Sequence, residues 1–446
     1  RRSARARARA RGFKPSVPEC RGVNRDEWTL AATMSGVHGL DHPAKRLFPL
    51  LVPVWAVTFG FPPCQLGVTL GAHTLGSAVG QAPIGHLSDR GDRRRLLATG
   101  IALIGVGTAA VGVAPLVQGG SVAGFSPAFL ALSTATLAAG LGSAFVHPTG
   151  YPLISANVPE STRGKVLGMW GSAARFGDGL APAIVGALLL VVAWPAIVIG
   201  VGGGIVLAAV ALLVVLRGFD TTPTARHDRA DREAVTRDRR TFVYPFAAVT
   251  LYFAVQIAAT NAVTVFLPQF LTASYDLTGT VAGVSLTAES SASFYYAGLL
   301  LFAGVFQLAT GELVDRHDPR RVLLVFLAVG AASLGALAAF SLSHVGLVGV
   351  LVVLGASLWG LNPARDSLVD AIAPKGGEGK TFGYLWTGTL LVSAAAPPLI
   401  GYVGDRAGLR VGFGLLAVIV IISALPVLAL LSTRVYRPGP ERKPAD

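Results

Sequence analysis

The chain has 446 residues, of which 52% are hydrophobic and only 14% are charged, and its mean hydropathy is +0.60. So little charge cannot cover a soluble globule of this size, which predicts an all-α polytopic membrane protein embedded in the lipid bilayer. The net charge of +13 could suggest nucleic-acid binding. Because the basic residues lie in loops between apolar runs, we expect no nucleic-acid partner.

The N-terminal stretch differs in composition from the rest of the chain. Arg1 to Glu27 is basic, rich in turn-forming residues and without helical periodicity. We expect residues 1–34 to be a disordered arm, or an extension upstream of a true start at Met34, rather than a targeting peptide.

Twelve apolar runs follow, each long enough for a helix that crosses a bilayer. About 20 apolar residues are needed to span a hydrocarbon core of roughly 30 Å. The runs that meet this length are residues 37–60, 64–88, 95–118, 126–153, 163–192, 195–217, 242–271, 281–312, 320–342, 345–371, 380–403 and 409–432. The sequence therefore predicts twelve transmembrane helices.

The loops between these runs differ in charge from one side to the other. Loops after every second run hold many lysines and arginines, whereas the opposite loops hold only Arg406 and Arg410. By the positive-inside rule, we expect both termini in the cytoplasm and the protein in the plasma membrane. The two cysteines, Cys20 and Cys64, fall on opposite sides, so neither a disulfide nor a thiolate metal site is expected.

One charged string occurs twice. GHLSDRGDRRRLL begins at Gly85 and recurs as GELVDRHDPRRVLL from Gly311, half the chain further on. A second set of matches, including Pro148 with Pro363, has a slightly shorter spacing, and a Gly/Ser-rich insert at 118–127 explains the difference. The repeat predicts two six-helix halves, residues 35–217 and 242–432, with a cytoplasmic linker at 218–241 and a cytoplasmic tail at 433–446.

The repeated string resembles the Gly-x-Leu-x-Asp-Arg-x-Gly-Arg-Arg loop signature of the major facilitator superfamily. The resemblance covers roughly residues 35 to 432, and it implies a secondary transporter without a cofactor whose two bundles rock around a mid-membrane site. The matching residues, which the resemblance places at a cytoplasmic gate, are Gly85, Leu87, Asp89, Arg90, Arg93 and Arg94, and Gly311, Leu313, Asp315, Arg316 and Arg320.

Two positions depart from this signature. Asp92 and Asp318 stand where the family prefers glycine. Aspartate is among the few side chains tolerated in left-handed backbone, so we expect the turn to survive the change in that conformation.

Two further stretches, His38 to Pro53 and Ala144 to Gly186, are similar to the fosmidomycin-resistance-like branch of drug exporters. In that branch a His-x-x-x-His pair opens helix 1 and a His-Pro closes helix 4, which correspond here to His38, His42, His147 and Pro148. This resemblance implies proton-coupled efflux of a small organic compound. By the repeat register His147 corresponds to the polar residues around Asn362 and Asp366, close to the cytoplasmic end of the tenth run, so we group it with the cytoplasmic gate.

Charged residues within the fifth run are a candidate substrate site. Charges in hydrocarbon are costly, so Arg175 and Asp178 are functional candidates by default. Their spacing places both on one helix face near the middle of the membrane. We expect Arg175 to contact an anionic substrate group or a titrating partner; the alternative is a self-neutralising pair that fills space between helices.

The first run carries a second candidate cluster. His38, Asp41 and His42 could carry protons, because histidine titrates near neutrality. The alternative is interfacial anchoring, in which Lys45 and Arg46 snorkel to the headgroups at the cytoplasmic edge. An i, i+4 histidine pair is half a zinc site, but without a third nearby ligand we expect no metal.

Polar residues in the seventh and eighth runs complete the candidate cavity. Glu289 is expected about eight residues into its helix, where desolvation would suit a proton carrier. Gln256 and Asn261 could bind substrate or, alternatively, bridge helices. Aromatic candidates for the cavity wall are Trp170, Tyr295, Tyr296, Tyr384 and Trp386.

Arg365 and Asp366 lie near the cytoplasmic end of the tenth run. We expect them to form part of the gate or an ion-pair cluster with the arginines of the second signature loop. No phosphate-binding loop or nucleophile motif occurs, so we expect no enzyme and a transporter driven by protons or another coupling ion, functional as a monomer. The alternatives are proton-coupled uptake of a small organic anion and a non-transporting membrane sensor with the same fold.

Overall fold

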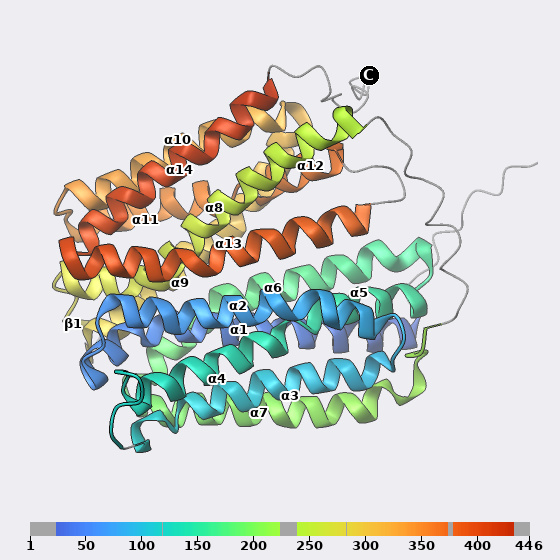
Figure 1. Cartoon of the computed structure of the whole chain (residues 1–446), viewed down its shortest axis with the longest axis horizontal. Coiled ribbons are helices and arrows are strands. Elements are labelled where there is room, and N and C mark those ends of the chain that lie inside the picture. Colours follow the sequence, from blue (N-terminus) through green and yellow to red (C-terminus); the bar gives the residue numbers. More distant parts are fainter. Residues whose placement is uncertain (1–23, 118, 224–238, 282, 373–377, 432–446) are drawn as a thin grey trace, which may run out of the picture.

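The computed structural model describes residues 24–117, 119–223, 239–281, 283–372 and 378–431. Within them the chain forms two helical bundles that lie side by side (Figure 1). The first bundle contains α1 (Arg25–Phe59), α2 (Pro63–Ser88), α3 (Arg93–Val111), α4 (Pro127–Ser143), α5 (Val146–Asn157), α6 (Glu160–Leu188) and α7 (Trp194–Val215), with short 3-10 turns at Ala114–Leu116 and Leu216–Gly218.

The second bundle repeats this arrangement. It contains α8 (Arg239–Ser274), α9 (Ala288–Arg316), α10 (Pro319–Ala339), α11 (His344–Leu358), α12 (Asn362–Ile372), α13 (Glu378–Ala407) and α14 (Leu409–Leu431), and a small hairpin of β1 (Gly279–Val281) and β2 (Val284–Leu286). Because α4 with α5 and α11 with α12 are each one interrupted span, every bundle has six membrane-spanning segments and the all-α fold is confirmed.

Helix boundaries follow the two repeat registers. The third span begins at Arg93 in the first half and at Pro319 in the second, and these two residues have the same spacing as the two copies of the signature string. The fourth span of the first half breaks after Ser143 and its counterpart breaks after Leu358, with the shorter spacing of the second set of matches. The same interruption therefore occurs at equivalent positions of both halves.

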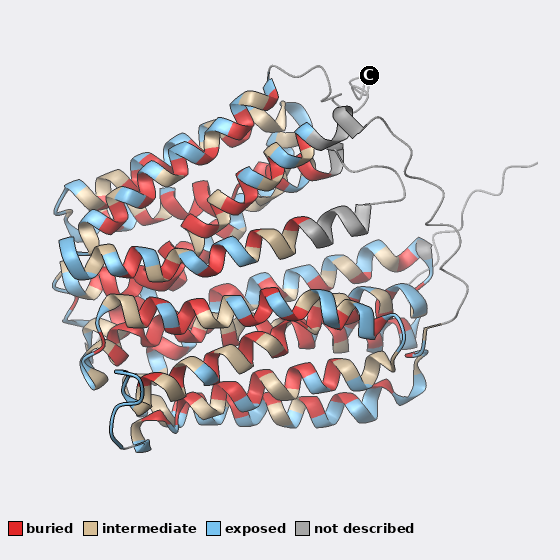
Figure 2. Cartoon of the chain, viewed as in Figure 1, coloured by how far each residue is buried: buried red, intermediate tan, exposed pale blue. Residues whose placement is uncertain are grey.

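Composition and exposure agree with a membrane environment. In the described part of the chain, nine helical segments are long and apolar enough to cross a bilayer. The spans α1, α2 and α6 are not among them, and α1 and α6 hold the charges discussed below. Exposed positions recur along α7 and α14 (Figure 2), and many are large and apolar, including Leu207 and Ile421. Such surfaces suit contact with lipid.

The start of α1 corrects the expected disordered arm. The helix begins at Arg25, where Asn24 and Glu27 form a reciprocal capping box that satisfies the first backbone N–H groups. Leu30 and Met34 are fully buried against the first bundle. The expectation of disorder is therefore wrong for residues 25–34. Residues 1–23, most of the expected linker (224–238) and the tail from 432 lie outside the described residues.

Asp92 and Asp318 also differ from expectation. Their φ angles are −68° and −60°, so neither is left-handed. Each is the N-cap of the following helix, and its carboxylate accepts a hydrogen bond at 2.9 Å from the backbone N–H of Arg94 or Arg320, respectively. Aspartate replaces glycine here because it caps a helix, a role that glycine fills less well.

The two halves meet mainly toward one end of the bundle. We call the end with the loops after α2 and α9 the signature side, and the end where α1 terminates the far side. Near the far side, Gly67 and Gly71 of α2 bring its backbone against Pro397 and Ala394 of α13. The Cys64 N–H donates to Asp405 at 3.1 Å across the same seam. Toward the signature side, α13 and α2 diverge (Figure 1).

Candidate functional site

Three histidines and a tryptophan meet inside the first half. His38 of α1 lies with its ring centroid 4.7 Å from His42, 5.0 Å from His147 of α5 and 4.6 Å from Trp170 of α6. The His38 Nδ1 is 2.9 Å from the carbonyl oxygen of Trp170, which fixes the ring. Because α1 begins at Arg25, His38 lies well inside the bundle rather than at the membrane edge.

Asp178 of α6 lies beside this cluster and is shared by three side chains. One carboxylate oxygen, Oδ1, is 2.9 Å from Nδ1 of His42 and 2.7 Å from Nε of Arg46. The other oxygen is 3.3 Å from a guanidinium nitrogen of Arg175. The Asp178 side chain is only 6% exposed, so its charge depends on these partners. Arg175 and Asp178 thus form part of a network, and the expectation of a self-neutralising pair is too narrow.

A second ion pair occupies the same region of α1. Asp41 is buried and accepts from Lys45 at 2.6 Å, an i, i+4 pair within the helix. Asp41 Oδ1, His38 Nε2 and the indole N–H of Trp170 have no protein partner among the described residues. Buried polar atoms are seldom left unpaired, so this part of the first half is a candidate functional site.

Arg46 connects the halves. While Nε contacts Asp178 of its own half, a terminal nitrogen lies 3.4 Å from the hydroxyl of Tyr296, a fully buried residue of α9 in the other half. The alternative that Arg46 and Lys45 snorkel to the headgroups is therefore wrong: both are engaged with buried carboxylates.

The structure places several predicted residues away from this network. Gln256 of α8 donates to Thr260 and to the Leu358 carbonyl, where α11 ends. Asn261 donates to Thr74 of α2 and to the Ser393 carbonyl of α13. Both therefore bridge helices, as the alternative interpretation held.

Glu289 is not placed as expected. It lies in the first turn of α9, because the chain from Gly279 to Leu286 forms the β1–β2 hairpin instead of helix. The free backbone N–H groups at a helix N-terminus carry partial positive charge, which favours a carboxylate at this position. A position eight residues into the helix is therefore wrong, and Glu289 lies at the far side next to Val57 and Trp194.

The predicted gate residues divide into two groups. His147 joins the histidine cluster, so grouping it with the gate is wrong in position. The signature residues make local contacts: Arg90 with His86, Arg94 with Asp92, and Arg316 with Glu312.

Other contacts of the signature loops stay within their own half. Arg93 donates to the Ser88 carbonyl, and Arg320 pairs with Asp318 and also donates to the Leu430 carbonyl at the end of α14, at 2.8 Å. Gly85 approaches Pro148, and Asp89, Asp315 and the segment around Gly311 are at the surface. Within the described residues, no hydrogen bond or ion pair joins one signature loop to the other.

Arg365 differs from the other gate candidates. Its side chain is 8% exposed, and its Nε donates to Asp366 at 3.0 Å. The guanidinium lies over the rings of Phe253 and Trp386, at 5.0 and 5.5 Å from their centroids. It pairs with its neighbour in sequence rather than with the arginines of the second signature loop, which corrects that expectation.

Sequence reasoning undervalued two residues of the site. Arg46 lies well before the end of α1 at Phe59, which at 1.5 Å per residue is about 20 Å inside. That count, taken from the far side, would have indicated a buried charge. His73 of α2 was not considered, yet it lies close enough to interact electrostatically with Lys45 and Asp41. The side chain of Tyr384, another aromatic candidate, lies outside the described residues.

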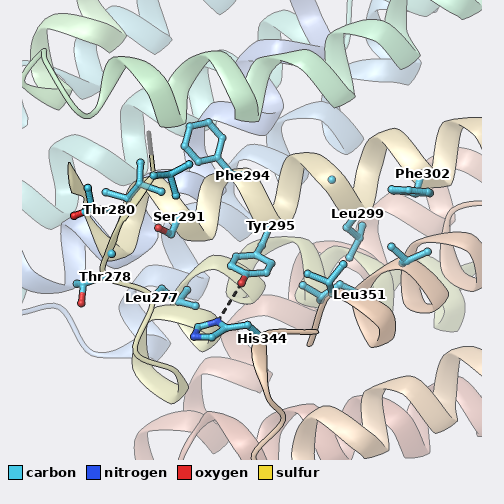
Figure 3. A pocket seen from close by; sticks show the side chains of 16 residues that line it. Leu277, Thr278, Thr280, Ser291, Phe294, Tyr295, Leu299, Phe302, His344 and Leu351 are labelled. Atoms are coloured by element: carbon cyan, nitrogen blue, oxygen red, sulfur yellow. Dashed lines mark hydrogen bonds between the residues drawn. The ribbon is translucent and has the colours of Figure 1, made fainter. Parts of the chain in front are cut away.

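A separate cavity lies in the second half at the far side. It has a volume of about 460 Å³ and is formed by α9, α11 and the β1–β2 hairpin (Figure 3). Apolar side chains such as Phe294, Phe302 and Leu351 dominate its wall, and the Tyr295 hydroxyl lies 3.2 Å from Nδ1 of His344. Tyr295 therefore lines this cavity rather than the charged network. In the part of the chain that is described, no group of His, Cys, Asp or Glu is placed to hold a metal ion.

Comparison with known sequences identifies the family. The sequence profile described as Major Facilitator Superfamily matches residues 34–288 and 285–446. An uncharacterized MFS-type transporter of Methanocaldococcus jannaschii is 30% identical over 138 residues, which is 31% of this chain and 33% of that protein. The multidrug resistance protein Stp of Mycobacterium tuberculosis is 30% identical over 153 residues, 32% of this chain and 26% of that protein. The chain thus matches at most about a third of the length of these curated relatives.

Solved structures share the fold. A bacterial homolog of the human lysosomal transporter Spinster, in an inward-facing and unoccupied conformation, aligns with a TM-score of 0.76 and 16% identity, covering 94% of this chain and all of that one. The xylose transporter XylE from E. coli, in an inward-open conformation, gives a TM-score of 0.67 at 15% identity, covering 93% and 97%. With a profile match over nearly the whole sequence and the same fold, the chain belongs to the Major Facilitator Superfamily.

Proposed function

We propose that this transporter exports a small organic molecule in exchange for protons, with His42 as a proton-binding group. Membrane transport by alternating access follows from the family and fold. The observation that supports proton coupling is the shared Oδ1 of Asp178, which His42 and Arg46 contact together. A proton on His42 adds a positive charge next to Arg46, the side chain that contacts both halves.

The coupling works through competition for one carboxylate. When His42 is neutral, Arg46 is the closest full positive charge to Asp178, and it also reaches Tyr296 of the other half. When His42 is protonated, it pairs more strongly with Asp178 and repels Arg46. The link from Arg46 to Tyr296 weakens, which favours separation of the halves on the far side.

Other charged and titratable groups set the field around His42. They come from every element that packs near it and are His38, Asp41, Lys45 and Arg46 on α1, His73 on α2, His147 on α5, Arg175 and Asp178 on α6, and Tyr296 on α9. His38 packs edge-on against both His42 and His147, so the three imidazole rings form one cluster.

The proposal also assigns sides. The excess of basic residues supports a cytoplasmic signature side, cytoplasmic termini and a plasma-membrane location. The signature residues, from Asp89 to Arg94 and from Asp315 to Arg320, then form the cytoplasmic gate, which closes when the far side opens. N-caps and arginine–carboxylate pairs are suited to hold helix ends together in that state.

The partial similarity to a protein named for multidrug resistance favours export. A specific observation favours the alternative, proton-coupled uptake of an organic anion: Arg175 offers a partly exposed positive charge at the cluster.

Everted membrane vesicles separate these functions. A pH gradient is first established by respiration, and members of a drug and metabolite panel are then added. Export by proton exchange predicts that a substrate releases the gradient in vesicles with the protein and not in vesicles that lack it. A gradient that no compound releases would contradict the exporter proposal. Acidification that accompanies a compound leaving the vesicle lumen would favour the symport alternative.

A further inference from the structure

We propose that the transported molecule is an organic monoanion, held between Arg175 of the first half and Arg365 of the second. This inference deepens the proposed function and rests on it for the location of the transport site.

Arg175 is only weakly compensated. Its side chain is 43% exposed, and its contact with Asp178, at 3.3 Å, is the longest of the three that this carboxylate makes. Arg46 already neutralises the single charge of Asp178 through a 2.7 Å contact. Arg46 and Arg175 thus share one carboxylate, and Arg175 has no full counterion within the network.

The surface around Arg175 is open. A Cβ added at Gly171 or Gly168, one and two turns before Arg175 on α6, would meet no atom within 4 Å, and both glycines are exposed. A ligand can therefore approach this guanidinium from the signature side without displacing protein atoms.

Arg365 faces the same space from the second half. Arg365 and its neighbour Asp366 both lie close enough to Arg175 to interact with it electrostatically. The planar faces of the Arg365 guanidinium are covered by Phe253 and Trp386. Among the described residues only its Nε has a protein acceptor, so the two terminal nitrogens remain as donors directed along the edge of the group. Such an edge matches a carboxylate.

The balance of charge sets the class of ligand. With His42 neutral, the described side chains at this interface include three positive charges, on Arg46, Arg175 and Arg365, and two negative charges, on Asp178 and Asp366. One negative charge on the ligand completes neutrality. A cationic substrate is disfavoured because Asp178 is already occupied by three partners and Asp366 is half exposed at 51%.

A bound monoanion would also join the halves. Tyr151 of α5 has a half-exposed ring and interacts electrostatically with Asp366, so it lies where an apolar or aromatic body of the ligand would extend. A carboxylate that contacts Arg175 and Arg365 together draws α6 toward α12, which is the movement needed to close the signature side around the substrate.

The test compares three ligands of one shape and different charge on the purified full chain. The probes are 2-naphthoate, neutral 2-naphthamide and cationic 2-naphthylmethylamine, and the readouts are equilibrium dialysis and the ligand-induced shift of the melting temperature. The inference predicts saturable binding of naphthoate and at least tenfold weaker binding of the other two, as expected for a charge-assisted contact.

Variants locate the binding site. Arg175→Gln and Arg365→Gln should each weaken naphthoate binding by about tenfold or more, whereas Arg175→Lys, which keeps the charge and tests folding, should retain part of it. The control Arg406→Gln removes an exposed arginine on the far side and should match the parent. The inference is overturned if the amide or amine binds as tightly as naphthoate, if no probe binds saturably, or if both glutamine variants bind normally.

These outcomes are independent of proton coupling. Arginine-dependent binding of naphthoate without release of a pH gradient in vesicles would leave the inference standing and contradict the proposed coupling. Gradient release by neutral or cationic compounds, with no anion binding, would support the coupling and overturn the inference.

Discussion

Arg46 and Asp178, 132 residues apart, form a 2.7 Å ion pair between α1 and α6 inside the first half. The same arginine reaches Tyr296 of the other half at 3.4 Å. The Asp178 carboxylate is therefore linked to the other half through Arg46.

Asp178→Asn should destabilise the protein strongly. The substitution leaves Arg46 buried without a counterion, and removal of one partner from a buried pair costs about 3–5 kcal/mol. We expect a clear drop in the melting temperature in detergent. The control is Glu312→Gln, which breaks an ion pair of comparable geometry whose side chains are 67% and 70% exposed, and should cost at most about 1 kcal/mol. Equal destabilisation by the two variants would show that Asp178 does not act as a buried counterion on which the fold depends.

Closure of the far side should depend on Gly67. A Cβ at this position would overlap the backbone carbonyl of Pro397, so Gly67→Ala forces α2 away from α13. We expect faster amide hydrogen exchange in residues 394–401, measured by mass spectrometry. Gly36→Ala is the matched control, because a Cβ there meets no atom within 4 Å, and it should leave exchange unchanged. Unaltered exchange in Gly67→Ala would mean that the seam tolerates separation without loss of structure.

Asp405 should hold the far side shut. Its carboxylate accepts from the Cys64 N–H at the start of α2, a favourable site for a negative charge. In a Cys20→Ser background, Asp405→Asn should increase the rate at which a membrane-impermeant maleimide labels Cys64, by a few-fold. Asp276→Asn, which changes an acid in the β1–β2 region, serves as control. Identical labelling rates in all three proteins would rule out this latch.

The N-cap role of Asp92 makes a prediction about pH. Partial burial raises the pKa of Asp92, but hydrogen bonds from Thr221 and from the Arg94 N–H outweigh it and hold the pKa below the usual 3.8. A depressed folded pKa gives stability that is present above pH 4 and is lost as the pH falls through the folded value. Asp92→Ala should cost about 1 kcal/mol at pH 7, and Asp92→Asn should keep most of the cap. Thermal unfolding of both variants at pH 7 and below pH 4 measures this: the difference between the parent and Asp92→Ala should shrink in acid, and a constant difference would contradict the role.

The sequence predicted the fold well because its signals are strong and local. Apolar runs of span length and a duplicated string give twelve spans in two halves, and the breaks after Ser143 and Leu358 follow the repeat register. The start of α1 was misplaced since its first turns are amphipathic within a bundle, where Leu30 and Met34 pack, rather than apolar all round.

The site was predicted only in part. Arg175, Asp178, His38 and His42 were recognised because charge within an apolar run is visible in sequence. Their partners were not, because Arg46 and Tyr296 come together from elements 250 residues apart. Glu289 was misplaced because the β1–β2 hairpin is as apolar as the helix that follows it, so hydropathy does not mark where α9 begins.

Proton movement during transport by a His42→Gln variant shows whether coupling runs through His42. Glutamine keeps a hydrogen-bonding side chain near Asp178 but does not take up a proton near neutral pH. With a compound that releases the pH gradient in parent vesicles, we predict that His42→Gln retains substrate counterflow and loses gradient release. The control His344→Gln, which changes a histidine of the far-side cavity, should retain both. Gradient release by His42→Gln at the parent rate would contradict proton coupling through His42.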